Sequence, residues 1–206
     1  MIHMNALIIM IKNPVKGKVK TRLAKDIGEE KALLVYNTLL QHTYKVITEI
    51  QCDRFIFYSD IIDRKDQFTN NDFKKYVQCD GDLGVRMEYA FSIPFKNEYH
   101  KVVMIGADCY DLTALQIQNA FDALDNNDFV IGPAKDGGYY LIGMKKWNRW
   151  IFKDKPWSTE NLLNETLNDI TNHNASVFQL DQLSDIDTIV DLKSNSELSS
   201  QFLNPE

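Results

Sequence analysis

The sequence predicts an α/β domain in which helices cover both faces of a mostly parallel sheet. Short apolar runs alternate along the chain with longer segments whose apolar residues recur at helical spacing, and this alternation is typical of layered α/β folds. The runs at 5–11 and 102–105 are apolar at consecutive positions, as expected for strands buried on both faces. A chain of 206 residues without a repeat or a linker fits a single domain spanning residues 1–206.

The elements are expected in a regular order along the chain. Strands are predicted at 5–11, 55–59, 76–78, 102–105, 128–133, 139–144 and 177–180, and helices at 21–27, 29–47, around 87–91, 113–124, 158–170 and from 185–188 through 192. Gly28 is placed to separate the first two helices. The strand at 139–144 returns from a tight loop, so it is expected to run antiparallel and make the sheet mixed. The polar residues 194–206 are expected to fray.

Charge and cysteine content exclude several classes of protein. A formal charge of −6 and a pI near 5.3 argue against a nucleic-acid-binding surface. The cations at 12–25 nevertheless gather in one segment, which suits a small anionic ligand. Three cysteines without CxxC spacing favour neither a disulfide framework nor a zinc site, and they predict a cytoplasmic location. No apolar run reaches transmembrane length, so no membrane span is expected.

Two carboxylates, Asp108 and Asp111, follow the buried run at 102–105. Ligands of open α/β sheets bind at the carboxyl ends of the strands, where an aspartate can hold a cation against phosphate oxygens. No helix is expected immediately after Asp108, whereas Asp111 precedes the predicted helix at 113–124 and can cap it. We therefore expect Asp108 to be the metal ligand and Asp111 the cap.

The loop at 12–23 leaves the first strand with Gly17 and several cations. Such a loop offers backbone N–H groups and positive charge to phosphates, although it matches neither GxxxxGK[ST] nor GxGxxG. Lys12, Lys20 and Arg22 are expected to hold the phosphates, and a guanidinium can clamp them bidentately. The alternative is a solvated lysine-rich loop.

A second glycine-containing loop, residues 80–86, leads into a predicted helix. Its glycines favour tight turns close to a ligand, with Asp82 and Arg86 as candidate ligand-binding residues. Arg86 lies at the expected start of the helix, where it could meet an anion. An ordinary turn explains the same residues equally well.

A third such loop contains Asp136, Gly137 and Gly138. The adjacent glycines would let the backbone approach a bound molecule, and Tyr139 or Tyr140 could stack on a sugar or a base. A β-turn of the Asp-Gly type explains the glycines but not the paired tyrosines.

The segment Asp185-Ile186-Asp187 offers a second pair of carboxylates late in the chain. A divalent ion shared by Asp108, Asp187 and a pyrophosphate would have the hard oxygen ligands that it prefers. Capping of the last predicted helix accounts for Asp187 just as well. The four histidines lie in no metal-ligand spacing, and no serine lies in a GxSxG motif.

Taken together, the motifs resemble a bacterial family of GT-A-like transferases that is named for its association with radical-SAM or selenium-related genes. Some members are assigned to arsenosugar biosynthesis as glycosyltransferases. The matching segments are Lys12-x-Pro14-x-x-Gly17-x-Val19-Lys20-Thr21-Arg22-Leu23, Gly81-Asp82-Leu83-Gly84-x-Arg86-Met87, Ile105-Gly106-Ala107-Asp108-Cys109, Gly132-Pro133-Ala134-x-Asp136-Gly137-Gly138-Tyr139-Tyr140-Leu141-Ile142-Gly143, Trp157-Ser158-Thr159 and Asp185-Ile186-Asp187-Thr188. The chain departs from the family at Tyr110, where proline is common.

This resemblance implies a Rossmann-like, three-layer GT-A fold, that of nucleotide-diphospho-sugar transferases. The fold is similar to that of the molybdenum-cofactor and phospholactate guanylyltransferases. The resemblance also implies a nucleotide-bound donor at the carboxyl edge of the sheet, with Mg²⁺ or Mn²⁺ on Asp108. A shared fold does not by itself establish an activity.

The leading hypothesis is a metal-dependent glycosyltransferase that moves a sugar from a nucleotide-sugar to a small acceptor. Asp108 would hold the metal, Asp187 or Asp136 would support it or act as base, and Tyr139 or Tyr140 would line the acceptor side. The alternative enzyme is a nucleotidylyltransferase that releases pyrophosphate from GTP or CTP, although residues 12–23 lack the GGxSxRMGxxK pattern of the molybdenum-cofactor enzymes. A non-catalytic nucleotide-binding module ranks third. The sequence leaves open whether the chain forms a homo-oligomer.

Overall fold

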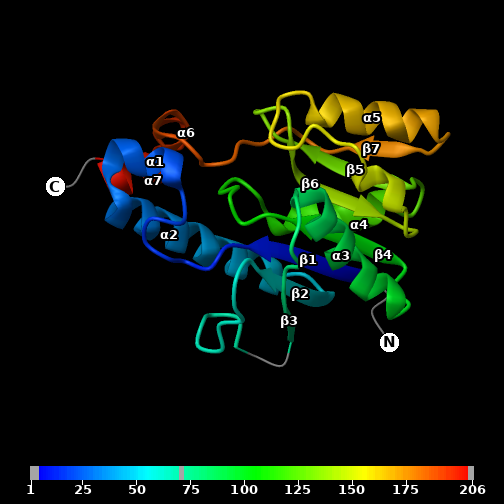
Figure 1. Ribbon diagram of the computed structural model, residues 1–206, viewed down its shortest axis with the longest axis horizontal. Helices are drawn as coiled ribbons and strands as arrows, with labels where there is room; N and C mark the ends of the chain where they lie inside the picture. Colours follow the sequence, from blue (N-terminus) through cyan, green and yellow to red (C-terminus); the bar gives the residue numbers. More distant parts are fainter. Residues whose placement is uncertain (1–4, 70–71, 204–206) are drawn as a thin grey trace.

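A mixed seven-stranded sheet in the order β3-β2-β1-β4-β6-β5-β7 organises the fold (Figure 1). The computed structural model describes residues 5–69 and 72–203. The strands are β1 (Asn5–Ile11), β2 (Asp53–Tyr58), β3 (Phe73–Val77), β4 (Lys101–Ile105), β5 (Phe129–Pro133), β6 (Tyr139–Met144) and β7 (Val177–Gln179). The helices are α1 (Thr21–Ile27), α2 (Glu29–Thr48), α3 (Leu83–Lys96), α4 (Ala114–Ala123), the 3₁₀ helix η1 (Arg149–Phe152), α5 (Leu162–Asn172), α6 (Ile189–Ser194) and α7 (Ser196–Leu203).

The pairing of the strands confirms the predicted mostly parallel, mixed sheet. Strand β1 lies between β2 and β4 and is parallel to both. Strand β6 is antiparallel to β4 and to β5, as the tight return at its start predicts. The carboxyl ends of β1 and β4 therefore lie side by side, and the loops that follow these two strands begin at the same edge of the sheet.

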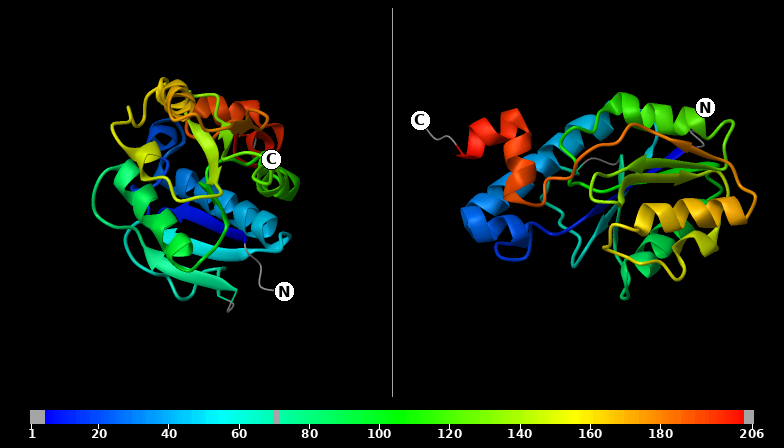
Figure 2. Two further views of the ribbon diagram at one scale, coloured as in Figure 1. Left: turned by 90° about the vertical axis from the view of Figure 1, so that its right-hand side faces the viewer. Right: turned by 90° about the horizontal axis from the view of Figure 1, so that it is seen from above.

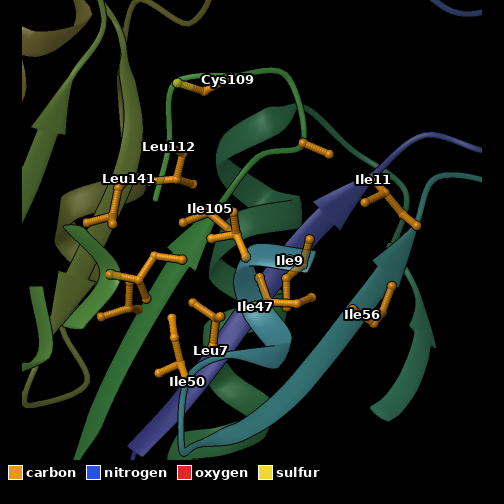
Figure 3. Close-up of a cluster of buried hydrophobic side chains, with 14 of the residues drawn as sticks. Leu7, Ile9, Ile11, Ile47, Ile50, Ile56, Ile105, Cys109, Leu112 and Leu141 are labelled. Carbon is orange, nitrogen blue, oxygen red and sulfur yellow. The ribbon is translucent and has the colours of Figure 1, made fainter. Parts of the chain in front are cut away.

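Helices cover both faces of the sheet, and each face has its own hydrophobic core. Helices α2 and α4 cover one face, where side chains such as Leu7, Ile9, Ile47 and Ile105 pack together (Figure 3). Helices α3 and α5, with η1, cover the other face, where Phe91 is among the buried residues. The two buried faces explain the near-continuous apolar runs of the central strands, and this layering confirms the predicted fold class.

A third, smaller core lies beyond the sheet and joins the C-terminal helices to α1 and α2. The C-terminal helices α6 and α7 lie beside α1 and the first part of α2 (Figure 2), and Leu23, Val35, Leu198 and Phe202 are buried between them. The expectation that residues 194–206 fray is wrong for the described part, because α7 buries two apolar side chains that the polar composition hides; residues 204–206 lie outside the described residues. This core returns the segment before α6 to the loop between β1 and α1.

Two predicted helix caps differ from those of the structure. Thr113, not Asp111, caps α4 through a capping box with Gln116, while the Asp111 carboxylate accepts a hydrogen bond from Asn195 Nδ2 at 3.1 Å. Likewise Thr188 caps α6, so capping does not account for Asp187. Both corrections show that a hydroxyl residue nearer to the helix takes the role that an upstream aspartate was expected to have.

Two element boundaries also differ from the predicted ones. Helix α5 begins at Leu162 after Asn161 and not at Ser158, since Ser158 has a φ of 63° in the left-handed region. Strand β3 begins at Phe73, three residues before the predicted 76–78, because the two lysines of this edge strand, Lys74 and Lys75, interrupt the apolar run that would reveal it. Within 5–69 and 72–203, no helix has the length and apolar character needed to cross a membrane.

Candidate active site

A cleft of about 700 Å³ opens at the carboxyl edge of the sheet. Its walls come from the loop after β1, the start of α3, the loops after β4 and β5, residues 157–162 and residues 185–187. It brings together most of the predicted site residues, namely Lys12, Lys20, Arg22, Arg86, Asp108, Asp136, Gly138, Tyr139, Tyr140 and Asp187. Gly17, Asp82 and Gly137 do not line it.

Lys20 joins the two predicted metal-binding carboxylates. Its side chain is 3 % exposed, and its Nζ lies 2.5 Å from Asp108 Oδ1 and 2.9 Å from Asp187 Oδ1. Burial alone would lower the pKa of Lys20, but the carboxylates of Asp108 and Asp187 raise it above its ordinary value. The lysine is therefore an ammonium ion, and it holds together two acids that lie far apart in the sequence.

The pKa values of Asp185 and Asp187 are shifted in opposite directions. Burial and the neighbouring Asp108 carboxylate raise the pKa of Asp185 to about 7. Burial would also raise the pKa of Asp187, but the Lys20 ammonium holds it below its usual range. The sequence offers Asp185 as one of a pair of carboxylates, but only Asp187 is predicted as a metal ligand. The apolar Ile186 between the two acids is the signal that both acids lie on the same side of the segment.

The arrangement of Asp108 and Asp187 fits a divalent cation that a ligand helps to coordinate. Two carboxylate oxygens from different segments converge on a single cationic atom, Lys20 Nζ. Across the described parts of the chain, no group of three or more His, Cys, Asp or Glu side chains is placed to hold a metal. Mg²⁺ is commonly bound by one or two carboxylates together with substrate phosphates. These two acids fit that kind of site and do not form a complete protein cage.

The basic loop is anchored at its start by Tyr36 from α2. The Lys12 backbone N–H donates to the Tyr36 hydroxyl oxygen at 2.8 Å, and this hydroxyl donates to the Lys12 carbonyl at 3.0 Å. Lys12 and Arg22 line the cleft, and their charges help to lower the pKa of Asp187. Gly17, with a φ of 77°, lies instead against the side chain of Glu29. We call the group formed by Lys12, Lys20, Arg22, Asp108 and Asp187 the charged end of the cleft.

The loop that begins α3 uses its acid as a helix cap. Asp82 Oδ1 accepts from the Val85 backbone N–H at 2.9 Å, which accounts for this carboxylate within the protein. Arg86 Nε donates to the Gly81 carbonyl at 2.9 Å, and the residue lines the cleft. Of the two residues predicted here, only Arg86 is therefore placed to meet a ligand.

The loop between β5 and β6 is a tight turn. Asp136 Oδ1 accepts from the Gly138 backbone N–H at 2.9 Å, and Asp136 also lines the cleft. Gly137 has a φ of 88°, and a Cβ at this position would lie 2.2 Å from the Glu160 carbonyl oxygen. The glycine thus lets this turn pack directly against the segment 157–162.

The two predicted tyrosines have their hydroxyl groups inside the protein. Tyr140 donates to the Asp181 carbonyl at 3.0 Å, and its ring occupies the space that a Cβ on Gly132 would need. The Tyr139 hydroxyl is buried beside Thr166. Both residues line the cleft, so they are available to a ligand through their rings and not through their hydroxyl groups.

A second group of cleft-lining residues is apolar and is not predicted as a site from the sequence. We call it the Trp157 end, formed by Met10, Leu83, Met87, Met104 and Trp157. Individual apolar residues carry no sequence signal for binding, since most of them belong to cores. This end offers a surface on which a flat ring could pack.

Gln78 is a second residue that sequence reasoning missed. Its Nε2 donates to the Ile11 carbonyl at 3.1 Å and to the Phe57 carbonyl at 3.0 Å. Both amide hydrogens are thereby used at the ends of β1 and β2, which leaves the side-chain carbonyl of a cleft-lining residue as an acceptor.

Comparison with solved structures supports the fold assignment. A candidate nucleotide-diphospho-sugar transferase from Desulfovibrio desulfuricans G20 is 29 % identical, with a TM-score of 0.86 over 96 % of this chain and 91 % of that chain. The inositol-1-phosphate CTP transferase from T. maritima is 15 % identical, with a TM-score of 0.61 over 98 % and 97 %. Rv0371C from Mycobacterium tuberculosis H37Rv, in complex with manganese, is 12 % identical, with a TM-score of 0.55 over 92 % and 96 %.

The family is established by the sequence itself. A comparison with curated proteins gives no significant match. A family model matches residues 40–159, which is more than half of the chain and includes α3, β4 and the loop with Asp136. The chain belongs to the bacterial family described as "Uncharacterized protein conserved in bacteria (DUF2064)".

Proposed function

We propose that the protein is a metal-dependent glycosyltransferase that moves a sugar from a nucleotide-sugar donor to a small acceptor. The observation that carries this proposal is the charged end of the cleft, where Lys20 bridges Asp108 and Asp187 between the ends of β1 and β4. Cations beside a carboxylate pair suit a diphosphate with its divalent ion. The likeness to the candidate nucleotide-diphospho-sugar transferase of Desulfovibrio desulfuricans G20 supports the same choice.

In this proposal the charged end binds the leaving group. Lys12, Lys20 and Arg22 hold the phosphate oxygens, and Asp108 and Asp187 hold Mg²⁺ or Mn²⁺. When bound, the metal stabilises the negative charge that develops on the leaving diphosphate. The manganese complex of Rv0371C from Mycobacterium tuberculosis H37Rv, which has a similar fold, supports this choice of ion.

The rest of the cleft receives the sugar that is transferred and the small acceptor. Gly137 and Gly138 keep the turn beside Asp136 close to the cleft, so Asp136 remains the candidate supporting ligand or base. The rings of Tyr139 and Tyr140 form the side for the acceptor.

We further propose that residues 1–206 act as a single cytoplasmic domain. The motif resemblance also supports the proposal that the gene lies near radical-SAM or selenium-related genes.

The second candidate is nucleotidylyl transfer, in which a phosphorylated small molecule attacks a nucleoside triphosphate and pyrophosphate leaves. Two observations favour it: a basic loop directly follows β1, and the fold is similar to that of the inositol-1-phosphate CTP transferase from T. maritima. The absence of GGxSxRMGxxK from residues 12–23 argues against it. A non-catalytic nucleotide-binding module stays third.

The test incubates the protein with Mn²⁺ and either nucleotide-sugars or nucleoside triphosphates, together with a panel of small acceptors. Sugar transfer with release of a nucleoside diphosphate supports the first proposal. Pyrophosphate release without sugar transfer supports the second. Thermal stabilisation by nucleotides without turnover of either kind would support the third candidate, a non-catalytic nucleotide-binding module. In that case Asp108→Ala should not impair function in cells.

A further inference from the structure

One buried lysine occupies the place where the proposed metal site requires a cation. Lys20 Nζ contacts Asp108 Oδ1 at 2.5 Å and Asp187 Oδ1 at 2.9 Å. A divalent ion such as Mg²⁺ binds carboxylate oxygens at about 2.0–2.1 Å. The ammonium and the metal would therefore use the same two oxygens, and they cannot both hold them in this arrangement.

The surroundings explain why a cation is needed here even without a metal. The carboxylates of Asp108, Asp136 and Asp187 all act electrostatically on Asp185, so negative charge is concentrated in this part of the cleft. Carboxylates that lie this close together repel one another unless a cation lies between them. Lys20 supplies the compensating charge, and its backbone adopts the left-handed region, with φ 48° and ψ 43°, at the N-cap of α1. A residue other than glycine rarely has this conformation.

The phosphate-binding role proposed for Lys20 conflicts with this position. While the ammonium is held between two carboxylates, two of its three N–H donors are directed at the protein, and the side chain is only 3 % exposed. Lys12 and Arg22, which line the same cleft, form no such bridge among the described ion pairs. A ligand with phosphate groups can therefore meet Lys12 and Arg22 directly, but it reaches Lys20 only if the lysine leaves the acids.

We propose that Lys20 is an exchangeable counter-ion. In the free protein it holds Asp108 and Asp187 together. When a divalent ion and a diphosphate group bind together, the Lys20 side chain leaves the two carboxylates and its ammonium group contacts phosphate oxygens instead. This inference rests on the proposed function, because it requires a metal-diphosphate ligand of the kind that either enzyme candidate would use. Its consequence is that metal and diphosphate bind cooperatively, since each removes an obstacle to the other.

The test measures Mn²⁺ binding, not turnover. Protein-bound Mn²⁺ is followed by electron paramagnetic resonance in titrations of the protein with the metal alone and with inorganic pyrophosphate, after correction for the Mn²⁺–pyrophosphate complex measured without protein. We expect pyrophosphate to tighten Mn²⁺ binding to the wild-type protein by about tenfold, which is within the usual range of coupling. In Lys20→Met we expect Mn²⁺ alone to bind about tenfold more tightly than to the wild type, and pyrophosphate to add little.

Among the described residues, a second buried lysine provides a matched control. The Lys155 side chain is 1 % exposed and contacts Asp169, and Lys155 does not line the cleft. Lys155→Met should lose stability, as Lys20→Met should, but its Mn²⁺ affinity and its response to pyrophosphate should remain those of the wild type. Equal behaviour of the two variants toward Mn²⁺ would overturn the proposal.

Two further variants cover the case in which Lys20→Met does not fold. Lys20→Arg keeps the charge, so Mn²⁺ alone should bind no more tightly than to the wild type. Mn²⁺ should also raise the Tm of Lys20→Gln more than that of the wild type, because the metal then replaces a missing cation. Tighter binding to Lys20→Arg, or an equal Tm increase for Lys20→Gln and wild type, counts against the exchange. Failure of the sugar-transfer assay alone does not, since no reading here depends on turnover.

Discussion

The two ends of the cleft are held together in different ways. At the charged end, Lys20 joins Asp108 and Asp187 by ion pairs between segments that are distant in the sequence. At the Trp157 end, backbone segments pack so closely that a Cβ on Gly84 would lie 2.7 Å from the Trp157 ring. Ion pairs can exchange partners when a charged ligand binds, whereas close packing has one arrangement. The charged end is therefore the adaptable half of the site and the Trp157 end the fixed half.

The largest expected effect tests whether the charged end carries the chemistry. Asp108→Asn removes the proposed metal ligand without changing its size, so we expect transfer activity to fall by about 10²–10³-fold or more. Asp111→Asn is the matched control, since Asp111 lies three residues away and contacts Asn195 outside the cleft. It should keep nearly full activity. Steady-state kinetics compare the transfer activities of the two variants, and thermal unfolding confirms that both are folded. Equal losses would remove Asp108 from the site.

The next prediction concerns the fixed half of the cleft. In Gly84→Ala the new Cβ would lie 2.6 Å from the Phe152 carbonyl oxygen as well as against Trp157, so α3 or the Trp157 segment has to move. Overpacking of this kind costs about 1–3 kcal/mol in the free energy of unfolding, which denaturant titration measures. Unchanged stability would show that the Trp157 end is as adaptable as the charged end.

The sequence and the structure agree best where a residue type carries its own signal. Apolar runs predict the central strands, and charged residues single out Lys20, Asp108 and Asp187, which the structure brings together in one cleft. Their contact was not predictable, because Lys20 and Asp187 are 167 positions apart. It depends on contacts outside any local motif: the Ile186 backbone N–H donates to the Asp108 carbonyl at 2.9 Å, and Ile186 is buried in the same cluster as Leu198 and Phe202 of α7. These contacts hold Asp187 at the cleft.

The Trp157 end was missed for a different physical reason. Gly84 and Gly137 were interpreted as turn or ligand-approach residues, but each one makes room for another part of the protein. A sequence shows that a glycine is present and does not show which neighbour approaches it. The same limitation applies to Asp82, whose carboxylate caps α3.

A substitution at Gly106 is expected to have an effect of intermediate size. It tests whether this position contacts a ligand, because it should change ligand affinity without changing the packing of the protein. Gly106 lines the cleft between β4 and Asp108, and a Cβ placed on it would meet no atom within 4 Å. Gly106→Ala should therefore leave the free energy of unfolding unchanged while a ligand loses the space that the methyl group fills. We expect nucleotide affinity to fall by about tenfold, or ~1.4 kcal/mol, as measured by calorimetric titration. Unchanged affinity would show that no ligand approaches this position.

The smallest expected effect tests how the tyrosines take part. Tyr140→Phe removes the hydroxyl group that donates to the Asp181 carbonyl and keeps the ring that lines the cleft. Loss of this hydrogen bond should lower the free energy of unfolding by about 0.5–1.5 kcal/mol. Because the hydroxyl group is used inside the protein, kcat and the KM for the acceptor should remain those of the wild type. A raised acceptor KM with unchanged stability would mean that the hydroxyl group leaves Asp181 to bind the acceptor, and would make this part of the cleft adaptable too.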